Sequence, residues 1–169
     1  MRGHSEIEQQ TSPEAALGDQ PVDLDVLGGT PGWYFRVIEL QLSRDLARRV
    51  KHLEPIRGKG RITALLLIDR QPHIRASILS EVMLLDRSAV ARILDGLEGA
   101  GLIRRSVAPG DNRVFDLSVT PAGARIAETL RGIVTRQSGD FFACLSPQEH
   151  DILLDILRRT YARLREARA

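Results

Sequence analysis

The feature that most restricts the fold is a change of hydrophobic period within residues 87–119. From 87 to 100, apolar residues recur every three or four positions, as on one face of an amphipathic helix. From 114 to 119, apolar and polar residues alternate as in a half-buried strand, and 102–107 form a second strand-like run. Residues 108–113, which separate the two runs, are rich in turn formers. This order predicts a helix followed directly by a β-hairpin with a protruding tip.

The helix of this motif has defined ends and two different faces. Asp86 is expected to be its N-cap, because a carboxylate at that position accepts hydrogen bonds from the free amides of the first turn. Gly99 and Gly101 mark its C-terminal end. The face expected to be buried holds Val90, Ile93, Leu94 and Leu97, and the opposite face holds Ser88, Ala91, Arg92 and Asp95.

Five further helices are expected from apolar periodicity and from helix-end signals. Prolines at the first helical position follow a capping residue at Thr120 and at Ser146, and Ser146 forms a capping box with Glu149. The expected helices cover about 31–53, 62–70, 75–83, 121–143 and 147–167. The sequence therefore predicts a mainly α fold with a small β-hairpin wing.

The helices at 75–83 and 87–100 are joined by the short turn 84–86, which predicts a helix-turn-helix. Ser88 and Arg92 lie one turn apart near the start of the second helix, where a major-groove reader places its base contacts. An arginine can bind guanine O6 and N7 with two hydrogen bonds, whereas a serine can bind either a phosphate or a base. Arg87, which follows the cap, contacts either phosphate or only solvent. Double-stranded DNA is therefore the expected partner, and 57–120 the expected DNA-binding domain.

The hairpin tip provides a second candidate contact. A cation at such a tip can enter the neighbouring minor groove, where negative potential is concentrated, and Arg113 is the candidate. Asp111 cannot itself favour DNA, so we expect it to orient the guanidinium of Arg113. The alternative is an exposed ion pair within the turn, which contributes little. Arg104 and Arg105, on the preceding strand, are expected on a solvated face or at phosphates.

The net charge of +2 is unevenly distributed. Residues 1–30 contain six acids and one base, a charge of −5, so the rest of the chain carries +7. A basic body suits a polyanion-binding domain, although an ordinary solvated surface would look similar. Residues 11–14 contain a cap and a proline that can start one short helix, and we otherwise expect 1–30 to be an acidic, mobile arm.

Other classes of protein find little support in the chain. No apolar run approaches the roughly 20 residues of a membrane span, the first residues lack a secretory pattern, and Cys144 is the single cysteine, so we expect a cytoplasmic protein. There is no phosphate loop and no nucleophile elbow, and the four histidines are scattered. We therefore expect no enzyme, no catalytic residues, no metal site and no cofactor. A winged-helix adaptor that binds protein instead of DNA stays an alternative.

The outer helices carry more apolar residues than the small middle domain can cover. Segments 31–56 and 121–167 are therefore expected to form a helical dimerisation layer, which would make the protein a homodimer. The alternative is a larger single-chain bundle.

Residues 85–105 resemble the recognition helix and first wing strand of the MarR-type (multiple antibiotic resistance regulator) repressors. Residues 110–113 and 117–123 resemble that family's wing and the start of its fifth helix. The resemblance implies a homodimer, joined by the first, fifth and sixth helices, that binds a near-palindromic operator. It also implies that the recognition-helix contacts are Ser88 and Arg92, and that the wing pair is Asp111 and Arg113. Departures from the family pattern occur at Leu84, Arg75 and Gly96.

Family members are often released from DNA by a small ligand that enters between the dimer layer and the winged domain. Aromatic and cationic residues begin the first expected helix and cationic residues and a histidine flank the second, and together they suggest an aromatic acid or its CoA thioester, with control of an aromatic-degradation operon. The effector candidates are Trp33, Tyr34, Arg36, Arg61, Arg70 and His73. For each of them, an ordinary place in the core or on the surface is the alternative. Oxidation of Cys144 is a second possible switch, but we expect that cysteine to be buried and structural.

Overall fold

The computed structural model describes residues 15–17, 20–108 and 111–167, and it describes the side chains of 22–107 and 115–167. The chain forms two compact units, 1–44 and 45–169, each of which is considered by itself. The expected short helix at 11–14 lies outside the described residues.

The first unit contains structure that the sequence did not predict. Strand β1 (Ala15–Leu17) pairs antiparallel with β2 (Gln20–Val22), and a 3-10 turn, η1 (Asp25–Leu27), follows. Three-residue strands are too short to show a hydrophobic period, which is why the pattern predicted only an arm. Helix α1 (Pro31–Arg49) begins at Pro31 as expected but ends four residues earlier than predicted. The end of α1, from Asp45, belongs to the second unit, as does the 3-10 segment that follows it, η2 (Glu54–Ile56).

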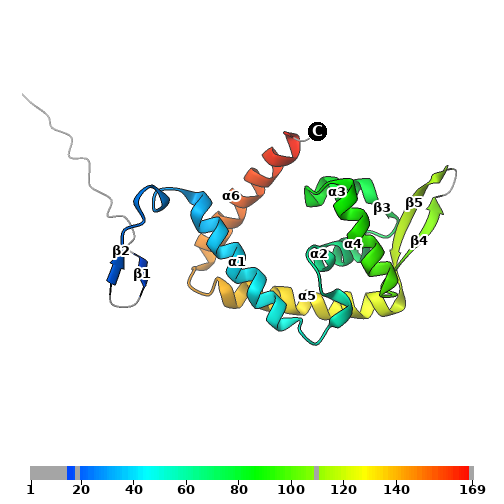
Figure 1. Ribbon diagram of the computed structural model, residues 1–169, viewed down its shortest axis with the longest axis horizontal. Coiled ribbons are helices and arrows are strands. Elements are labelled where there is room, and N and C mark those ends of the chain that lie inside the picture. The colour runs from blue at the N-terminus through cyan, green and yellow to red at the C-terminus, as the bar shows by residue number, and fades with distance from the viewer. Residues whose placement is uncertain (1–14, 18–19, 109–110, 168–169) are drawn as a thin grey trace, which may run out of the picture. The chain divides into compact units, whose positions relative to one another are not determined.

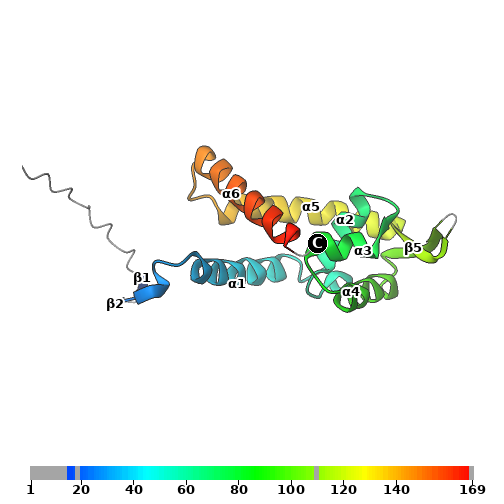
Figure 2. The same cartoon turned by 90° about the horizontal axis from the view of Figure 1, so that it is seen from above.

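The second unit holds the remaining helices around one apolar core. These are α2 (Arg61–Arg70), α3 (Ala76–Met83), α4 (Arg87–Gly99), α5 (Pro121–Phe141) and α6 (Pro147–Glu166). Helix α2 packs against both α4 and α5, and α3 packs against α4 (Figures 1 and 2). Leu65, Leu79, Leu97, Leu117 and Leu130 are fully buried and come from five different elements. The mainly α fold is confirmed.

The hairpin is part of a three-stranded antiparallel sheet in the order β3-β5-β4. Its strands are β3 (Ile74–Arg75), β4 (Ile103–Ala108) and β5 (Asp111–Val119). The two-residue β3 was not predicted, and it ties the region before α3 to the centre of the sheet by pairing Ile74 with Leu117. In Figure 1, β4 and β5 run side by side away from the helices, as a wing does.

Three expected helix starts are confirmed by their hydrogen bonds. The Asp86 carboxylate accepts from the Ala89 amide at 2.7 Å, and the Thr120 hydroxyl accepts from the Gly123 amide at 3.0 Å. Ser146 and Glu149 form the reciprocal capping box. A glycine is required at position 123, because a Cβ there would collide with the carbonyl oxygen of Leu102, which precedes β4.

One expectation about exposure is wrong. Cys144 is exposed, because α5 ends at Phe141 and the cysteine lies in the turn that leads to α6. None of the helices in the described part of the chain is both long and apolar enough to cross a membrane.

Helix α6, all of whose residues are described, has no buried residue. Its apolar side chains at Ile152, Ile156 and Leu164 are 59%, 44% and 53% exposed. Near its C-terminal end, the Tyr161 hydroxyl donates to the Val82 carbonyl of α3 at 2.7 Å. The apolar stripe of α6 is thus left largely uncovered by its own chain.

Candidate nucleic-acid interface

The turn between α3 and α4 is held by hydrogen bonds that fix the angle between the two helices. Leu84 adopts a left-handed conformation, with φ of 52°, which ends α3. The Leu85 amide then donates to the Ser80 carbonyl at 3.1 Å, and the Ser80 hydroxyl donates to the Leu85 carbonyl at 2.6 Å. A residue with a Cβ is strained at positive φ, so this turn persists because its surroundings determine it.

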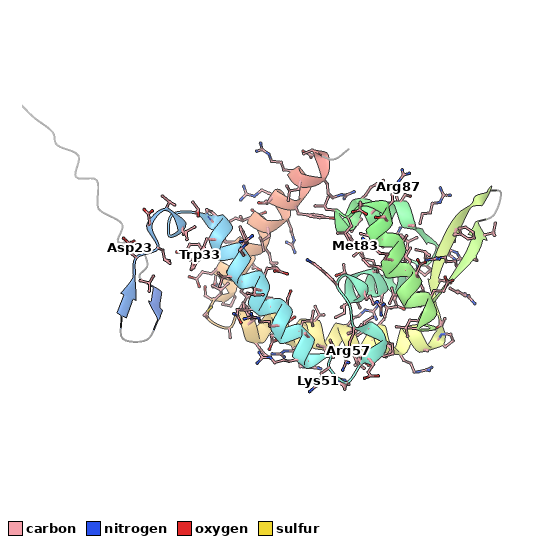
Figure 3. The ribbon with its side chains drawn as sticks, viewed as in Figure 1. Asp23, Trp33, Lys51, Arg57, Met83 and Arg87 are labelled. Atoms are coloured by element: carbon pink, nitrogen blue, oxygen red, sulfur yellow. The ribbon has the colours of Figure 1, made fainter. Side chains whose placement is uncertain are left out.

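Helix α4 divides its residues between core and solvent as the periodicity predicted. Val90, Ile93, Leu94 and Leu97 are buried, and α4 packs against α2 and α3 through this face. Ser88, Ala91, Arg92 and Asp95 are all exposed. Arg87 is exposed at the start of the helix (Figure 3). The structure therefore brings the three recognition-helix candidates together on the outer surface of the first two turns.

The charges at this helix start are organised around Asp86. Its Oδ1 atom accepts from the Ser88 hydroxyl and from the Ala89 amide, each at 2.7 Å. These two hydrogen bonds lower the pKa of the Asp86 carboxyl, and the positive charge of Arg92 lowers it further. Within the described residues, Arg92 has no ion-pair partner within 4.0 Å. Its guanidinium is thus available to an external acceptor.

The two arginines of β4 are already engaged within the protein. Arg105 Nη2 lies 2.6 Å from Asp95 Oδ1, and Arg105 Nη1 lies 3.2 Å from Glu98 Oε2. Arg104 donates from Nε to the Ser118 hydroxyl at 2.9 Å. The sequence had placed both on a solvated face or at phosphates, whereas Arg105 joins the wing to α4. The sequence contained a signal for this contact. Asp95 and Glu98 are spaced i, i+3 at the end of the helix, just before the strand that carries Arg105.

Gly96 has a structural explanation that the sequence did not reveal. The Arg61 guanidinium of α2 occupies the space that a Gly96 side chain would take, with its Cζ atom 2.6 Å from an ideal Cβ position. Arg61 also donates to the Pro55 carbonyl at 3.3 Å. A positive charge therefore lies against α4 one turn beyond Arg92, although it is supplied by a different helix.

For the two wing candidates, Asp111 and Arg113, the structure describes only the backbone. Asp111 and Arg113 belong to strand β5, and Asp111 is in register with Ala108 of β4. The sequence predicts a turn over 108–113, whereas β5 begins three residues earlier than predicted and β4, of the predicted length, ends one residue later. The side chains of Asp111 and Arg113 lie outside the described residues.

The effector candidates are divided between the two units. In the first unit, the rings of Trp33 and Tyr34 meet edge to face at 4.8 Å, and the Tyr34 hydroxyl donates to the Gly28 carbonyl at 3.2 Å. Arg36, on the next turn of α1, is exposed.

In the second unit, Arg70 is exposed at the end of α2. His73 Nδ1 lies 3.5 Å from the buried Asp116 carboxylate, and the His73 amide donates to the Leu117 carbonyl at 2.9 Å. A shallow hollow of about 290 Å³ lies elsewhere in this unit, at the corner between α5 and α6, and none of the six candidates lines it.

Comparison with known proteins gives consistent matches. The family model described as "MarR family" matches residues 60–115. A Thauera aromatica protein described as "Putative transcriptional regulatory protein for hcr operon" is 32% identical over 135 residues, which are 80% of this chain and 81% of that protein.

Solved structures of protein–DNA complexes share the fold. A Staphylococcus aureus MepR–DNA complex has a TM-score of 0.70 at 18% identity, covering 79% of this chain and 98% of that one. A mutant Escherichia coli MarR bound to operator DNA has a TM-score of 0.69 at 23% identity, covering 76% of this chain and 91% of that one.

Proposed function

Because this chain belongs to the MarR family of DNA-binding transcriptional regulators, we propose that it is a ligand-responsive repressor that binds a near-palindromic operator as a homodimer. The single observation that carries the proposal is the geometry of α4. Its apolar face is buried in its own domain, while Ser88 and Arg92 are presented together on the outside of its first turns. This is the arrangement that a helix needs to enter a major groove.

Salt dependence tests the DNA-binding part of the proposal. A protein that neutralises phosphates releases counterions, so its affinity for a duplex falls steeply as salt rises. Duplexes selected by the protein from a random pool would be titrated at several salt concentrations by fluorescence anisotropy. An affinity independent of salt would contradict the proposal and would favour the protein-binding adaptor.

The proposal assigns Arg113 to the minor groove and Asp111 to the orientation of its guanidinium. We expect Arg113→Ala to weaken binding of the selected duplex by about 1–3 kcal/mol. Asp111→Asn is the matched variant, and we expect it to weaken binding less, because it leaves the cation in place. Unaltered affinity in Arg113→Ala would show the wing assignment to be wrong.

Homodimerisation is supported by apolar surface that the chain leaves uncovered. On α1, Phe35, Val37 and Leu40 are 48%, 38% and 43% exposed, and α6 exposes a similar stripe. Exposed apolar stripes of this kind mark interaction surfaces. A second copy of segments 31–56 and 121–167 would cover them. Sedimentation velocity tests this directly, because a monomer at micromolar concentration would exclude the proposed dimer.

The proposed effector is an aromatic acid or its CoA thioester, and the proposed targets are genes of aromatic degradation. Support comes from Trp33 and Tyr34, whose rings meet edge to face near the start of α1, and from the exposed cation Arg36 close by on the same helix. Among the candidates that flank α2, Arg70 is exposed. Arg61 and His73 already have partners in the protein, which are the Pro55 carbonyl and the Asp116 carboxylate. Release of the selected duplex would be screened with benzoates, phenolic acids and their CoA thioesters. Failure of all of them to release DNA would remove this part of the proposal.

An oxidant-sensing function is the second candidate, because Cys144 is exposed and not buried as expected. An exposed thiol is accessible to peroxide, which a buried one is not. DNA release by peroxide in the wild type, and its loss in Cys144→Ser, would support this function. Equal behaviour of the two proteins would exclude it.

A further inference from the structure

Ser88 is the candidate contact whose chemistry the structure restricts most, and the inference drawn from it rests on the proposed function. Its hydroxyl is 2.7 Å from Asp86 Oδ1, and the same oxygen accepts from the Ala89 amide at 2.7 Å. A serine hydroxyl has one hydrogen to donate and two lone pairs to accept with. The question is therefore which of these remain for DNA.

The single hydrogen is already used. An ionised carboxylate has no hydrogen of its own and can only accept. The two hydrogen bonds from Ser88 and Ala89 lower the pKa of Asp86, so that its carboxyl is ionised at neutral pH. In the contact between Ser88 and Asp86, serine must be the donor. What Ser88 offers outward from α4 is then a pair of acceptor sites and no hydrogen.

Electrostatics next to Ser88 act in the same direction. A phosphate oxygen bonded to this hydroxyl would lie close to the Asp86 carboxylate and would be repelled by it. An exocyclic amine of a base carries partial positive charge and would be attracted. The cations that face the same surface are Arg87 and Arg92, both exposed, and these are better placed to hold phosphate or guanine. Ser88 is therefore left for a base that donates.

We propose that Ser88 is a specificity-determining residue that accepts a hydrogen bond from an exocyclic amine in the major groove, which is adenine N6 or cytosine N4. Guanine O6 and thymine O4 stand at the corresponding major-groove positions as acceptors. At the base that Ser88 contacts, the protein prefers A or C over G or T on one strand. This preference separates the bases with an amino group, A and C, from the bases with a keto group, G and T. An arginine contact instead selects guanine through its O6 and N7 atoms.

Selection of duplexes from a random pool tests the proposal with the full-length protein. The wild type would be compared with Ser88→Ala, Asp86→Asn and Asp86→Gly, and the affinities of four duplexes that differ only at the responsive position would then be measured. Asparagine keeps an acceptor oxygen where Asp86 Oδ1 lies, so Asp86→Asn should keep the preference. Glycine is tolerated at an N-cap but removes the acceptor, so Asp86→Gly frees the hydroxyl to donate.

The expected result is one position per half-site at which wild type and Asp86→Asn favour A or C about fivefold, the value of one net hydrogen bond. The preference should be absent in Ser88→Ala and should widen to include G or T in Asp86→Gly. A Ser88-dependent preference for G or T would overturn the proposal. If Ser88→Ala lowered the affinity for all four duplexes equally, Ser88 would contact a phosphate and the proposal would be wrong. An unchanged affinity in Ser88→Ala would also overturn it. Wild-type protein that enriches no sequence would instead contradict the proposed function itself.

Discussion

Helices α4 and α6 are built on the same plan and are used differently. Each starts with a side-chain cap, Asp86 in α4 and Ser146 in α6, and each has one apolar face. The apolar face of α4 is buried at four positions, whereas α6 buries none of its residues, all of which are described. An amphipathic helix needs a partner for its apolar face. Helix α4 has found that partner within its own domain, and α6 has not.

The difference is what the proposed function requires, in which one chain binds both DNA and a second copy of itself. Because the core holds α4 by Val90, Ile93, Leu94 and Leu97, its polar face is free to meet DNA. Because the apolar side chains of Ile152, Ile156 and Leu164 on α6 are largely uncovered by their own chain, they are free to meet another subunit. The face that each helix can offer to a partner is therefore the face that its own chain does not cover.

The largest expected effect is on folding, and it separates the two helices by the same substitution. Leu97 is 0% exposed on α4, and Leu164 is 53% exposed on α6. Leu97→Ala should lower the free energy of unfolding by about 2–5 kcal/mol, because it leaves a cavity in the core. Leu164→Ala should have an effect that depends on protein concentration. Urea denaturation at several concentrations measures both, and equal, concentration-independent losses would show that α6 is packed within its own chain.

The next effect is on association. Ile156, 44% exposed on the apolar stripe of α6, should become buried between subunits. Ile156→Ala should raise the dimer dissociation constant by about tenfold to a hundredfold, since apolar contacts are lost in both subunits. Arg158→Ala on the same helix is the matched control and should leave the constant unchanged. If sedimentation equilibrium gave the same constant for Ile156→Ala and wild type, the stripe would have another purpose.

The smallest effect is on the pH dependence of the two caps. Hydrogen bonds from Ser88 and the Ala89 amide lower the pKa of Asp86 below its usual 3.8, and those from the Ser146 amide and hydroxyl lower that of Glu149 below 4.5. A lowered folded-state pKa means that the unfolded chain binds more protons. Both contributions to stability are therefore complete above these usual values and are lost as pH falls through the lowered ones.

Loss of the Asp86 cap should affect unfolding of the whole domain, whereas loss of the Glu149 contact should affect only the start of α6. Asp86→Asn should flatten the acid dependence of global unfolding, because α4 is part of the core. Glu149→Gln should flatten only the acid dependence of amide exchange at the start of α6. Identical behaviour of the two variants, followed by denaturation and by hydrogen exchange between pH 3 and 7, would contradict the contrast between the helices.

The sequence predicted the parts of this molecule that depend on local chemistry. The caps at Asp86, Thr120 and Ser146 were visible because a cap needs a particular side chain next to particular amides. The buried face of α4 was visible because its period is sustained over three turns.

What the sequence could not show depends on contacts between distant segments. The pairing of Ile74 with Leu117 involves a strand too short to have a period. Arg61 reaches Gly96, and Arg105 reaches Asp95, only because the fold brings α2 and β4 beside α4. Cys144 is exposed in the turn between α5 and α6, and burial of a turn residue depends on distant segments that a local apolar pattern does not show.

The contrast between α4 and α6 is tested most directly by removing one exposed arginine from each. Arg92 of α4 and Arg158 of α6 are both exposed, and alanine at either position removes the same charge. Affinity for the selected duplex, measured by fluorescence anisotropy at one salt concentration, should fall by about 1–3 kcal/mol for Arg92→Ala and stay unchanged for Arg158→Ala. Equal losses would mean that DNA responds only to net charge, and would contradict the assignment of α4 as the recognition helix.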